Sequence, residues 1–321
     1  MTTRTSPAAV ATAPTSAQRF PAAAAATRAL PAPLSLEEGL ARYVEALTGR
    51  NVSPLTLRAY AADVRQFCMW LRATNVAVSR PDQVQRQDLR EYLAELARQG
   101  RSGVTRARKL AALRGYFAFL LGEGCVPTSP VHGIETPKKE KTGRTTLRLD
   151  EYTKLLSLAG GHPRDFCILT VFLQTGLRVS ELCDLRTGDV DLIAHTLTVV
   201  AGKGQKARTI ALEKKALQAL KGYLNARPRV LEERLFLNYR GEPLGERGVR
   251  KLVAKYLAAA GITKKASPHS LRHTFATYKA EKGVSPFQLQ EWLGHASLNT
   301  TQIYVHMARQ NGKKVMEATS L

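Results

Sequence analysis

The stretch QTGLRVSEL, residues 174–182, follows an apolar run and marks the start of a new helix. It places Arg178 in the first turn of that helix and Glu181 three residues later, so the two side chains share one face. The carboxylate can orient the guanidinium group while the fork of Arg178 points at a phosphate. Taken alone, the same spacing fits an ordinary surface Arg–Glu pair, so a phosphate site needs support from other parts of the chain.

A second basic motif lies in the helix expected to begin at Pro268. His269 and Arg272 are three residues apart, which puts a proton-transfer group beside a bidentate phosphate binder. His269 and His273 also have the i, i+4 spacing of zinc ligands. A zinc protease needs a Glu after the first His, and Ser270 stands there instead, so we expect no metal site.

A third motif covers the next helix and the residues that follow it. This helix is expected to begin at Ser285 and Pro286 and to end at Gly294, which places His295 where a loop meets a cleft. A short helix over 301–306 carries Tyr304. The ordinary interpretations are a capping role for the histidine and a core or surface position for the tyrosine.

Alternating residues predict one β-hairpin among these helices. Apolar and polar side chains alternate over 196–200 and continue over 207–212, on either side of a turn at 202–205. The turn has the sequence GKGQ and holds Lys203 between two glycines. It lacks the glycine spacing and the following Ser or Thr of a nucleotide-binding phosphate loop.

Residues 34–137 contain a series of predicted helices. One begins with Ser53 as N-cap and Pro54 in the first turn, and its apolar residues over 57–71 recur at helical spacing. Another covers 104–121. Basic side chains on these helices are candidate nucleic-acid contacts, with a solvated surface as the alternative. They are Arg58, Arg65 and Arg72 on the first helix, and Arg106, Arg108 and Lys109 on the second.

The composition indicates a folded protein with a polyanionic partner. The 321 residues include 48 Lys and Arg against 26 Asp and Glu, which gives a formal charge of +22. The length and the 44% hydrophobic content suggest two domains with real cores. No apolar run is long enough to span a membrane, so the charge favours nucleic acid. The four cysteines lack CxxC spacing and are expected to be reduced, as in a cytosolic protein.

Two changes in composition divide the chain. Residues 1–33 are rich in Ala, Pro, Thr and Ser and contain no acid, so we expect a disordered tail, with an organelle transit peptide as the alternative. Residues 136–141 combine Pro with charge, which predicts a linker at 138–144. The expected domains are therefore a helical one at 34–137 and a second one at 145–321.

Four motifs follow one another in a characteristic order: TGLRVSEL, GKGQKARTIAL, HSLRHTFAT and LGHASLNTTQIYVH. In this order they resemble the tyrosine site-specific recombinases of the phage integrase family, on its Xer branch. SPLTLRAYAADVRQF and TRARKLAALRGYFAFLLGEG resemble the family's N-terminal, SAM-like core-binding domain. The resemblance implies a mainly α protein, with an all-helical core-binding domain and an α+β catalytic domain that contains a small antiparallel sheet.

The resemblance also implies a role for each residue that matches a family motif. Arg178 and Arg272 grip the phosphate, and Glu181 supports the first of them. The remaining catalytic positions are Lys203 in the hairpin, His269 and His295 as the two histidines, and Tyr304 as the nucleophile.

The chemistry implied by this set starts from the weakness of a phenol as a nucleophile. A free phenol has a pKa near ~10, so Tyr304 needs a cationic pocket to attack a DNA phosphodiester at neutral pH. Lys203 is the candidate donor of a proton to the leaving 5'-oxygen, with His269 as its acid/base partner. The 3'-phosphotyrosine keeps the bond energy, so strand exchange through a Holliday junction is expected to need no metal and no other cofactor.

The expected partner is a double-stranded DNA recombination site, bound by a homotetramer on paired sites or by a heterotetramer with a related recombinase. The expected function is chromosome-dimer resolution, or integration and excision of a mobile element, in the cytoplasm and in association with the nucleoid. A type IB topoisomerase or telomere resolvase would use similar chemistry, and a non-catalytic DNA-binding protein would need only the charge. The N-terminal helical domain and the segment after Tyr304 favour recombination over the first alternative, and the complete set of six catalytic residues counts against the second.

The last fifteen residues, 307–321, contain a predicted helix break at 310–312 and a short amphipathic end. In the family that this chain resembles, the C-terminal segment packs into a neighbouring protomer. We expect residues 311–321 to couple protomers in this way, with folding back onto their own domain as the alternative.

Overall fold

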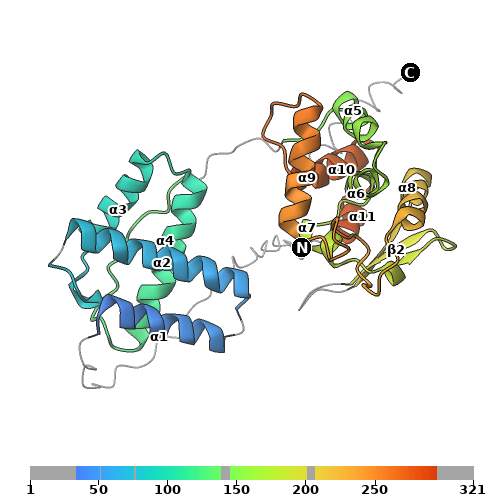
Figure 1. Ribbon diagram of the computed structural model, residues 1–321. Coiled ribbons are helices and arrows are strands. Elements are labelled where there is room, and N and C mark those ends of the chain that lie inside the picture. Colours follow the sequence, from blue (N-terminus) through green and yellow to red (C-terminus); the bar gives the residue numbers. More distant parts are fainter. Residues whose placement is uncertain (1–33, 51, 76, 139–144, 201–206, 295–321) are drawn as a thin grey trace, which may run out of the picture. The chain divides into compact units, whose positions relative to one another are not determined.

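The computed structural model describes residues 34–50, 52–75, 77–138, 145–200 and 207–294. The chain divides into two compact units between Thr142 and Gly143 (Figure 1). The predicted tail at 1–33 and residues 139–144 of the predicted linker lie outside the described residues. So do Lys203, His295, Tyr304 and the C-terminal segment.

The described part of the first unit is helical. Its elements are α1 (Leu36–Gly49), α2 (Pro54–Thr74), the 3₁₀ turn η1 (Pro81–Gln83), α3 (Arg86–Arg98) and α4 (Gly103–Gly122). The prediction for the start of α2 is confirmed, because the Ser53 hydroxyl accepts a hydrogen bond of 3.1 Å from the Thr56 N–H and Pro54 occupies the first turn. The helix predicted over 104–121 is α4.

Aromatic side chains fill the core of the first unit. Phe67 of α2 packs edge-on against Tyr92 of α3, with ring centroids 5.2 Å apart, and against Phe117 of α4. Leu110, Leu113, Phe117 and Leu120 of α4 are fully buried with them. The helical repeat of these apolar residues therefore determines how three helices pack together.

The second unit combines helices with a small sheet. Its elements are α5 (Leu149–Ala159), α6 (Pro163–Thr175), α7 (Val179–Asp184), η2 (Thr187–Asp189), β1 (Val190–Asp191), β2 (Thr196–Val199), β3 (Arg208–Ala211), α8 (Lys214–Ala226), α9 (Glu246–Ala259), α10 (Pro268–Glu281) and α11 (Pro286–Leu293). The expected mainly α fold with a small antiparallel sheet is confirmed.

The sheet has the strand order β1-β2-β3, and both pairs are antiparallel. Leu197 pairs with Val190 on one side and with Ile210 on the other. Leu197, Val199 and Ile210 point into the core, which fixes the register of the predicted hairpin. The turn between β2 and β3 lies outside the described residues.

Helix α6 lies in the middle of the second unit, with α5, α8 and α10 packed around it (Figure 1). Its residues from Cys167 to Phe172 are all fully buried, which explains the long apolar run before the motif at 174–182. A separate apolar cluster joins α10 to α11 through Phe275, Leu289 and Leu293. Because α10 packs against both α6 and α11, it fixes the positions of these two helices relative to each other. Among the described residues, no helix is long and apolar enough to cross a membrane.

Candidate active site

Glu181 lies at the centre of a group of arginines in the second unit. The main-chain N–H of Arg178 donates to its Oε2 at 2.7 Å, and Nη1 of the same residue donates to Oε1 at 2.6 Å. Helix α7 begins at Val179, so the prediction that Arg178 lies in its first turn is wrong by one residue. Arg178 is the N-cap, because the Glu181 carboxylate caps the helix start by accepting its N–H.

Two further guanidinium groups lie at the same carboxylate. Arg208 of β3 donates from Nη1 to Oε1 at 3.0 Å and from Nη2 to Oε2 at 2.8 Å. Nη1 of Arg272, on α10, is 3.9 Å from Oε2. We call Arg178, Glu181, Arg208 and Arg272 the Glu181 cluster. It holds three formal positive charges and one negative charge.

The same three arginines bind the last turn of α11. Arg208 Nε donates to the Trp292 carbonyl at 2.7 Å and Arg272 Nη2 donates to the Leu293 carbonyl at 2.6 Å. Arg178 Nη2 donates to the Gly294 carbonyl at 2.7 Å. The final carbonyls of a helix have no partner within the helix and carry its partial negative charge, so cations stabilise them. Glu181 and the end of α11 therefore hold the arginines from two sides.

Gly176 allows the chain between α6 and α7 to lie close to α10 and α11. It has a φ of +63°, and a Cβ at this position would lie 2.4 Å from the Phe275 ring and 2.9 Å from a Leu293 methyl group. Its carbonyl also accepts a hydrogen bond of 2.6 Å from Arg272 Nη1. A residue with a side chain would strain the backbone and push the start of α7 away from α10 and α11.

The surroundings keep Glu181 ionised. Burial raises the pKa of this carboxyl, but the hydrogen bonds and charges of Arg208 and Arg178 outweigh that effect and lower it to about 2. The side chain is 10% exposed, so the ion pairs are shielded from water. A permanently charged carboxylate therefore holds the arginines at neutral pH.

The Glu181 cluster borders a cavity of about 300 Å³. Arg178, Arg272 and the predicted histidine His269 line it, together with Ser180 and Arg250. The rings of His269 and His273 are stacked, with centroids 6.2 Å apart and planes inclined by 23°. Arg178, Arg272 and His269 are three of the predicted catalytic residues. They bring two guanidinium groups and one imidazole to the same cavity. That combination suits the binding of a phosphate and the transfer of a proton.

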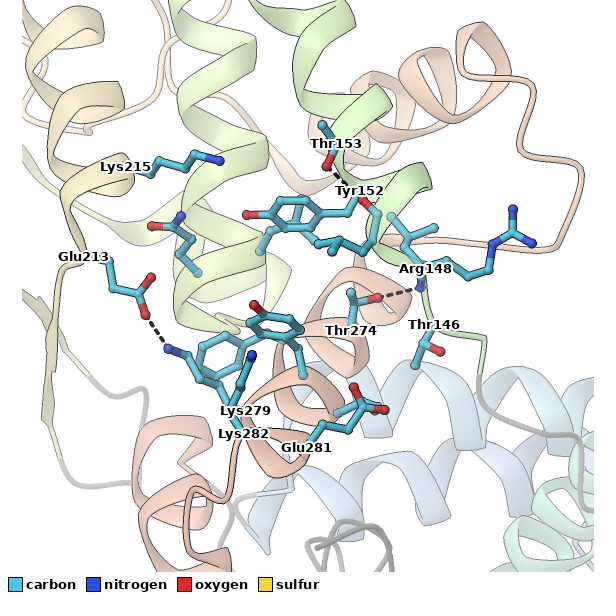
Figure 2. A pocket seen from close by; sticks show the side chains of 17 residues that line it. Thr146, Arg148, Tyr152, Thr153, Glu213, Lys215, Thr274, Lys279, Glu281 and Lys282 are labelled. Atoms are coloured by element: carbon cyan, nitrogen blue, oxygen red, sulfur yellow. Dashed lines mark hydrogen bonds and ion pairs between the residues drawn. The ribbon is translucent and has the colours of Figure 1, made fainter. Parts of the chain in front are cut away.

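A larger cavity of about 670 Å³ lies elsewhere in this unit, between α5, α6 and α10 (Figure 2). Tyr152 and Tyr278 line it, and Lys279 at its edge forms an ion pair with Glu213. None of the predicted catalytic residues that the structure describes lines it. The smaller cavity is therefore the candidate active site.

Sequence reasoning missed two arginines at this site. Arg208 is part of the quoted motif GKGQKARTIAL, but strand alternation does not say which acid an arginine will meet. Arg250 on α9 lines the cavity and forms an ion pair with Glu246. Only the i, i+4 spacing of that pair was visible in the sequence. Among the described residues, no group of three potential metal ligands is present.

The basic residues predicted to contact DNA occupy different environments in the first unit. Arg58, Arg65 and Arg72 are exposed along α2, and Arg72 forms an ion pair with Glu37. Arg106 is half-buried. On the same helix, Arg108 forms an ion pair with Asp63.

Lys109 was predicted to contact DNA, and the structure contradicts this prediction. Its side chain is only 7% exposed, and its ammonium group lies 2.7 Å from Asp63 Oδ1 and 2.5 Å from Gln66 Oε1. The ammonium group is directed at a carboxylate and an amide of α2, so it does not lie on the exposed surface where the DNA contacts were predicted. We therefore remove Lys109 from the candidate DNA contacts.

Comparison with known proteins gives matches for both units. Residues 145–311 match the phage integrase family, and residues 40–124 match the phage integrase N-terminal SAM-like domain. The tyrosine recombinase XerC of Pelobacter propionicus is 40% identical over 266 residues, which cover 81% of this chain and 87% of that protein. The tyrosine recombinase XerD of Bifidobacterium longum is 36% identical over 276 residues, which cover 81% and 89%.

Among solved structures, the XerH site-specific recombinase bound to palindromic difH substrate, in a post-cleavage complex, matches with a TM-score of 0.69 and 25% identity. The match covers 89% of this chain and 84% of that one. The two matched domains and the relatives define a class of enzymes that transfer DNA strands. The chain belongs to the phage integrase family of tyrosine recombinases, and the relatives given above are Xer proteins.

Proposed function

We propose that this protein is a site-specific DNA recombinase that cleaves and rejoins strands through a covalent bond to Tyr304. In this proposal residues 34–137 form the core-binding domain, residues 138–144 the linker and residues 145–321 the catalytic domain. The matches of the two parts to the SAM-like and phage integrase domains support the assignment. The cytoplasm, on the nucleoid, is the proposed location.

The observation that carries the proposal is the Glu181 cluster beside its cavity. Two guanidinium groups, of Arg178 and Arg272, line the same cavity as His269. Their positions are set by a shared carboxylate and by the last carbonyls of α11, before any substrate binds. Donors that are already oriented toward developing charge stabilise a transition state most effectively.

In the proposed reaction the Tyr304 oxygen attacks the phosphorus of a DNA phosphodiester. A bond forms between that oxygen and phosphorus, and the bond to the 5'-oxygen breaks. Arg178, Arg272 and His295 stabilise the charge on the non-bridging oxygens. His269 takes part in moving the tyrosine proton, and Lys203 donates a proton to the departing 5'-oxygen.

The product is a 3'-phosphotyrosine with a free 5'-hydroxyl on the other side of the break. Attack by a 5'-hydroxyl from a second duplex rejoins the strand and gives a Holliday junction, without ATP. Four protomers on two DNA sites would exchange the strands in pairs, as one chain or together with a related recombinase. The proposed biological setting is chromosome-dimer resolution or the integration and excision of a mobile element.

The test starts with a pool of duplexes that carry a random central sequence. Rounds of binding select the preferred site, and a nicked form of that site is then incubated with the protein and denatured. We expect a denaturant-stable protein–DNA adduct with the wild type and none with Tyr304→Phe, which keeps the ring and the DNA binding. An adduct of equal yield from Tyr304→Phe would reject this nucleophile.

The same reaction is expected to proceed in EDTA. The proposed charge stabilisation comes from Arg178, Arg272 and Lys203, so chelation removes nothing that the chemistry needs. A strict requirement for Mg²⁺ in cleavage, as distinct from a modest stimulation, would contradict the proposal.

A phosphorothiolate at the 5'-position separates the role of Lys203 from that of the arginines. A thiolate leaves without a proton, so Lys203→Ala is expected to recover on this substrate while Arg178→Ala is not. Equal defects of Lys203→Ala on both substrates would remove it from the general-acid role.

We also propose that residues 311–321 couple neighbouring protomers. A chain truncated after residue 310 is expected to bind one DNA site as the full chain does and to lose recombination between two sites. Gel shifts on single sites and a two-site recombination assay measure the two properties. Normal recombination by the truncated protein would show that this segment is not the coupler.

A further inference from the structure

Arg208 differs from the other arginines of the Glu181 cluster in its access to the cavity. Arg178 and Arg272 line the cavity, whereas Arg208 does not. Its side chain is 7% exposed, about as little as that of Arg272 at 5%, so the cavity lining and not the exposed fraction separates these two arginines. Arg208 is therefore placed to act on the other members of the cluster and not on a phosphate in the cavity.

The contacts of Arg208 fix the carboxylate of Glu181 in one orientation. Both terminal nitrogens of the guanidinium group donate to this carboxylate, one to each oxygen, at 3.0 and 2.8 Å. Each oxygen also accepts one hydrogen bond from Arg178. A planar two-point pair of this kind removes the rotation that a single contact would leave, and a lysine cannot replace it.

The third nitrogen of Arg208 connects the cluster to α11. Nε donates to the Trp292 carbonyl at 2.7 Å. Gly294 lies directly against the same guanidinium group, since a Cβ on Gly294 would be 2.8 Å from Nη1. Gly294 has a φ of +60°, and its carbonyl accepts from Arg178. One buried arginine thus holds both groups that orient Arg178, namely Glu181 and the end of α11.

We propose that Arg208 is a positioning residue for strand cleavage. It keeps Glu181 and the last turn of α11 in the places from which they aim Arg178 at the phosphate. The inference rests on the proposed recombinase function. Loss of this support moves a donor that must be aligned with the transition state, and a misplacement of about 1 Å costs on the order of 10²-fold in rate.

The experiment measures adduct formation in a single turnover on the nicked DNA site obtained by selection. Arg208→Met removes the guanidinium group, and Arg208→Lys keeps the charge but not the two-point contact. We expect both to slow cleavage by about 10²-fold while DNA affinity in gel shifts stays at the wild-type value. Full recovery of the rate in Arg208→Lys would overturn the proposal.

Arg227→Met is a matched control in the same unit. Arg227 is half-buried and donates to the main-chain carbonyls of Arg234 and Leu235, at 2.7 and 3.1 Å. Its removal takes away a comparable set of hydrogen bonds without touching Glu181. We expect Arg227→Met to cleave DNA at the wild-type rate per folded molecule, with thermal unfolding used to count the folded fraction of every variant.

A double-mutant cycle distinguishes positioning from a general loss of stability. If Arg208 acts through Arg178, Arg208→Met costs little in a protein that already carries Arg178→Ala. Two independent losses that multiply would overturn the proposal.

The pH profile gives a second readout. Without Arg208 the Glu181 carboxyl takes up its proton at a higher pH. On the acid side of the pH–rate profile, cleavage by Arg208→Met is therefore expected to slow at a higher pH than cleavage by the wild type. An unchanged acid side of the profile would contradict the proposed route through Glu181. Absence of an adduct from the wild type would reject the recombinase function itself, whereas a fast adduct from Arg208→Met rejects only the role of Arg208.

Discussion

Each unit of the protein holds a carboxylate against more than one basic side chain, and the two arrangements have different roles. In the first unit Asp63 meets Lys109 and Arg108, and Gln66 completes what we call the Asp63 cluster. In the second unit Glu181 meets Arg178, Arg208 and Arg272. The Asp63 cluster carries one formal positive charge beyond neutrality and the Glu181 cluster carries two.

Contact with a cavity separates the two clusters further. Lys109 is 7% exposed, with its ammonium group against Asp63 and Gln66, so its charge is used inside the protein. Arg178 is 29% exposed, and it lines a cavity together with Arg272, whose side chain is 5% exposed. Buried cations beside a carboxylate thus stabilise a fold when their N–H donors are all used by the carboxylate and by neighbouring acceptors. They make a candidate anion site when the cluster carries surplus charge at a cavity.

The largest effect is expected from breaking the Asp63 cluster. Asp63→Ala leaves the Lys109 ammonium buried without its carboxylate, and such a change destabilises a protein by about 3–5 kcal/mol. Urea unfolding of the first unit measures it. The double variant Asp63→Leu with Lys109→Met removes both charges and is expected to recover most of the loss. If the double variant is no more stable than Asp63→Ala, the cost does not come from an unpaired charge.

The next effect concerns the reaction. Arg178→Ala and Arg272→Ala are each expected to slow adduct formation by about 10²- to 10³-fold, the scale of one lost donor to a developing oxyanion. Lys109→Met is the counterpart in the first unit and is expected to leave the rate of the chemical step unchanged per folded molecule. Wild-type rates in either arginine variant would remove that arginine from the site.

The titration of Glu181 should appear in the pH dependence of stability. The pKa of Glu181 in the folded protein is about 2, below its ordinary value of 4.5. Its contribution to the free energy of unfolding is therefore complete above pH 4.5 and is lost as the pH falls toward 2. The contribution is of the order of 3 kcal/mol at neutral pH. The gap in unfolding free energy between the wild type and Glu181→Gln should therefore narrow as the pH falls through this window.

Glu233→Gln serves as the control for that measurement, because the Glu233 carboxylate is exposed and pairs with Arg186 at the surface. Its gap to the wild type is expected to stay small throughout. A gap for Glu181→Gln that is independent of pH would show that the carboxylate is not the group that stabilises the cluster.

The smallest effect is expected at the surface of α2. The Arg72–Glu37 pair has both side chains about half exposed, and pairs of this kind contribute roughly 0.2–1 kcal/mol. If Arg72 contacts a DNA phosphate instead, Arg72→Gln lowers the slope of log affinity against log salt by about 1. Salt titrations of DNA binding check this, and an unchanged slope would leave Arg72 as a surface ion pair.

The order of the motifs and the helical periodicity were sufficient to predict the architecture. Ser53 and Pro54 start a helix, Gly294 ends one, and the alternation around 202–205 gives a hairpin, because these features depend on local backbone preferences. The pattern that placed Arg106, Arg108 and Lys109 together on one helix was also local. It could not show that Lys109 turns inward, since that depends on Asp63 from another helix.

Three residues of the candidate site could be singled out from the sequence, but the network that holds them could not. Arg178, His269 and Arg272 were singled out by spacing and resemblance, and the structure brings them to one cavity. The role of α11 was not visible, because main-chain carbonyls accept hydrogen bonds whatever the residue type. The role of Arg208 was not visible either, because its partner Glu181 lies 27 positions earlier in the chain and local spacing does not pair the two residues.

The most direct measurement compares two DNA substrates that differ in one charge. The nicked site is prepared with an ordinary scissile phosphate or with a methylphosphonate, which replaces one anionic oxygen by a methyl group. If the arginines of the Glu181 cluster act on that charge, the defect of Arg178→Ala is large on the phosphate and mostly disappears on the methylphosphonate. An equal defect of Arg178→Ala on the two substrates would contradict the account, because the arginine would then not be stabilising the charge of the phosphate.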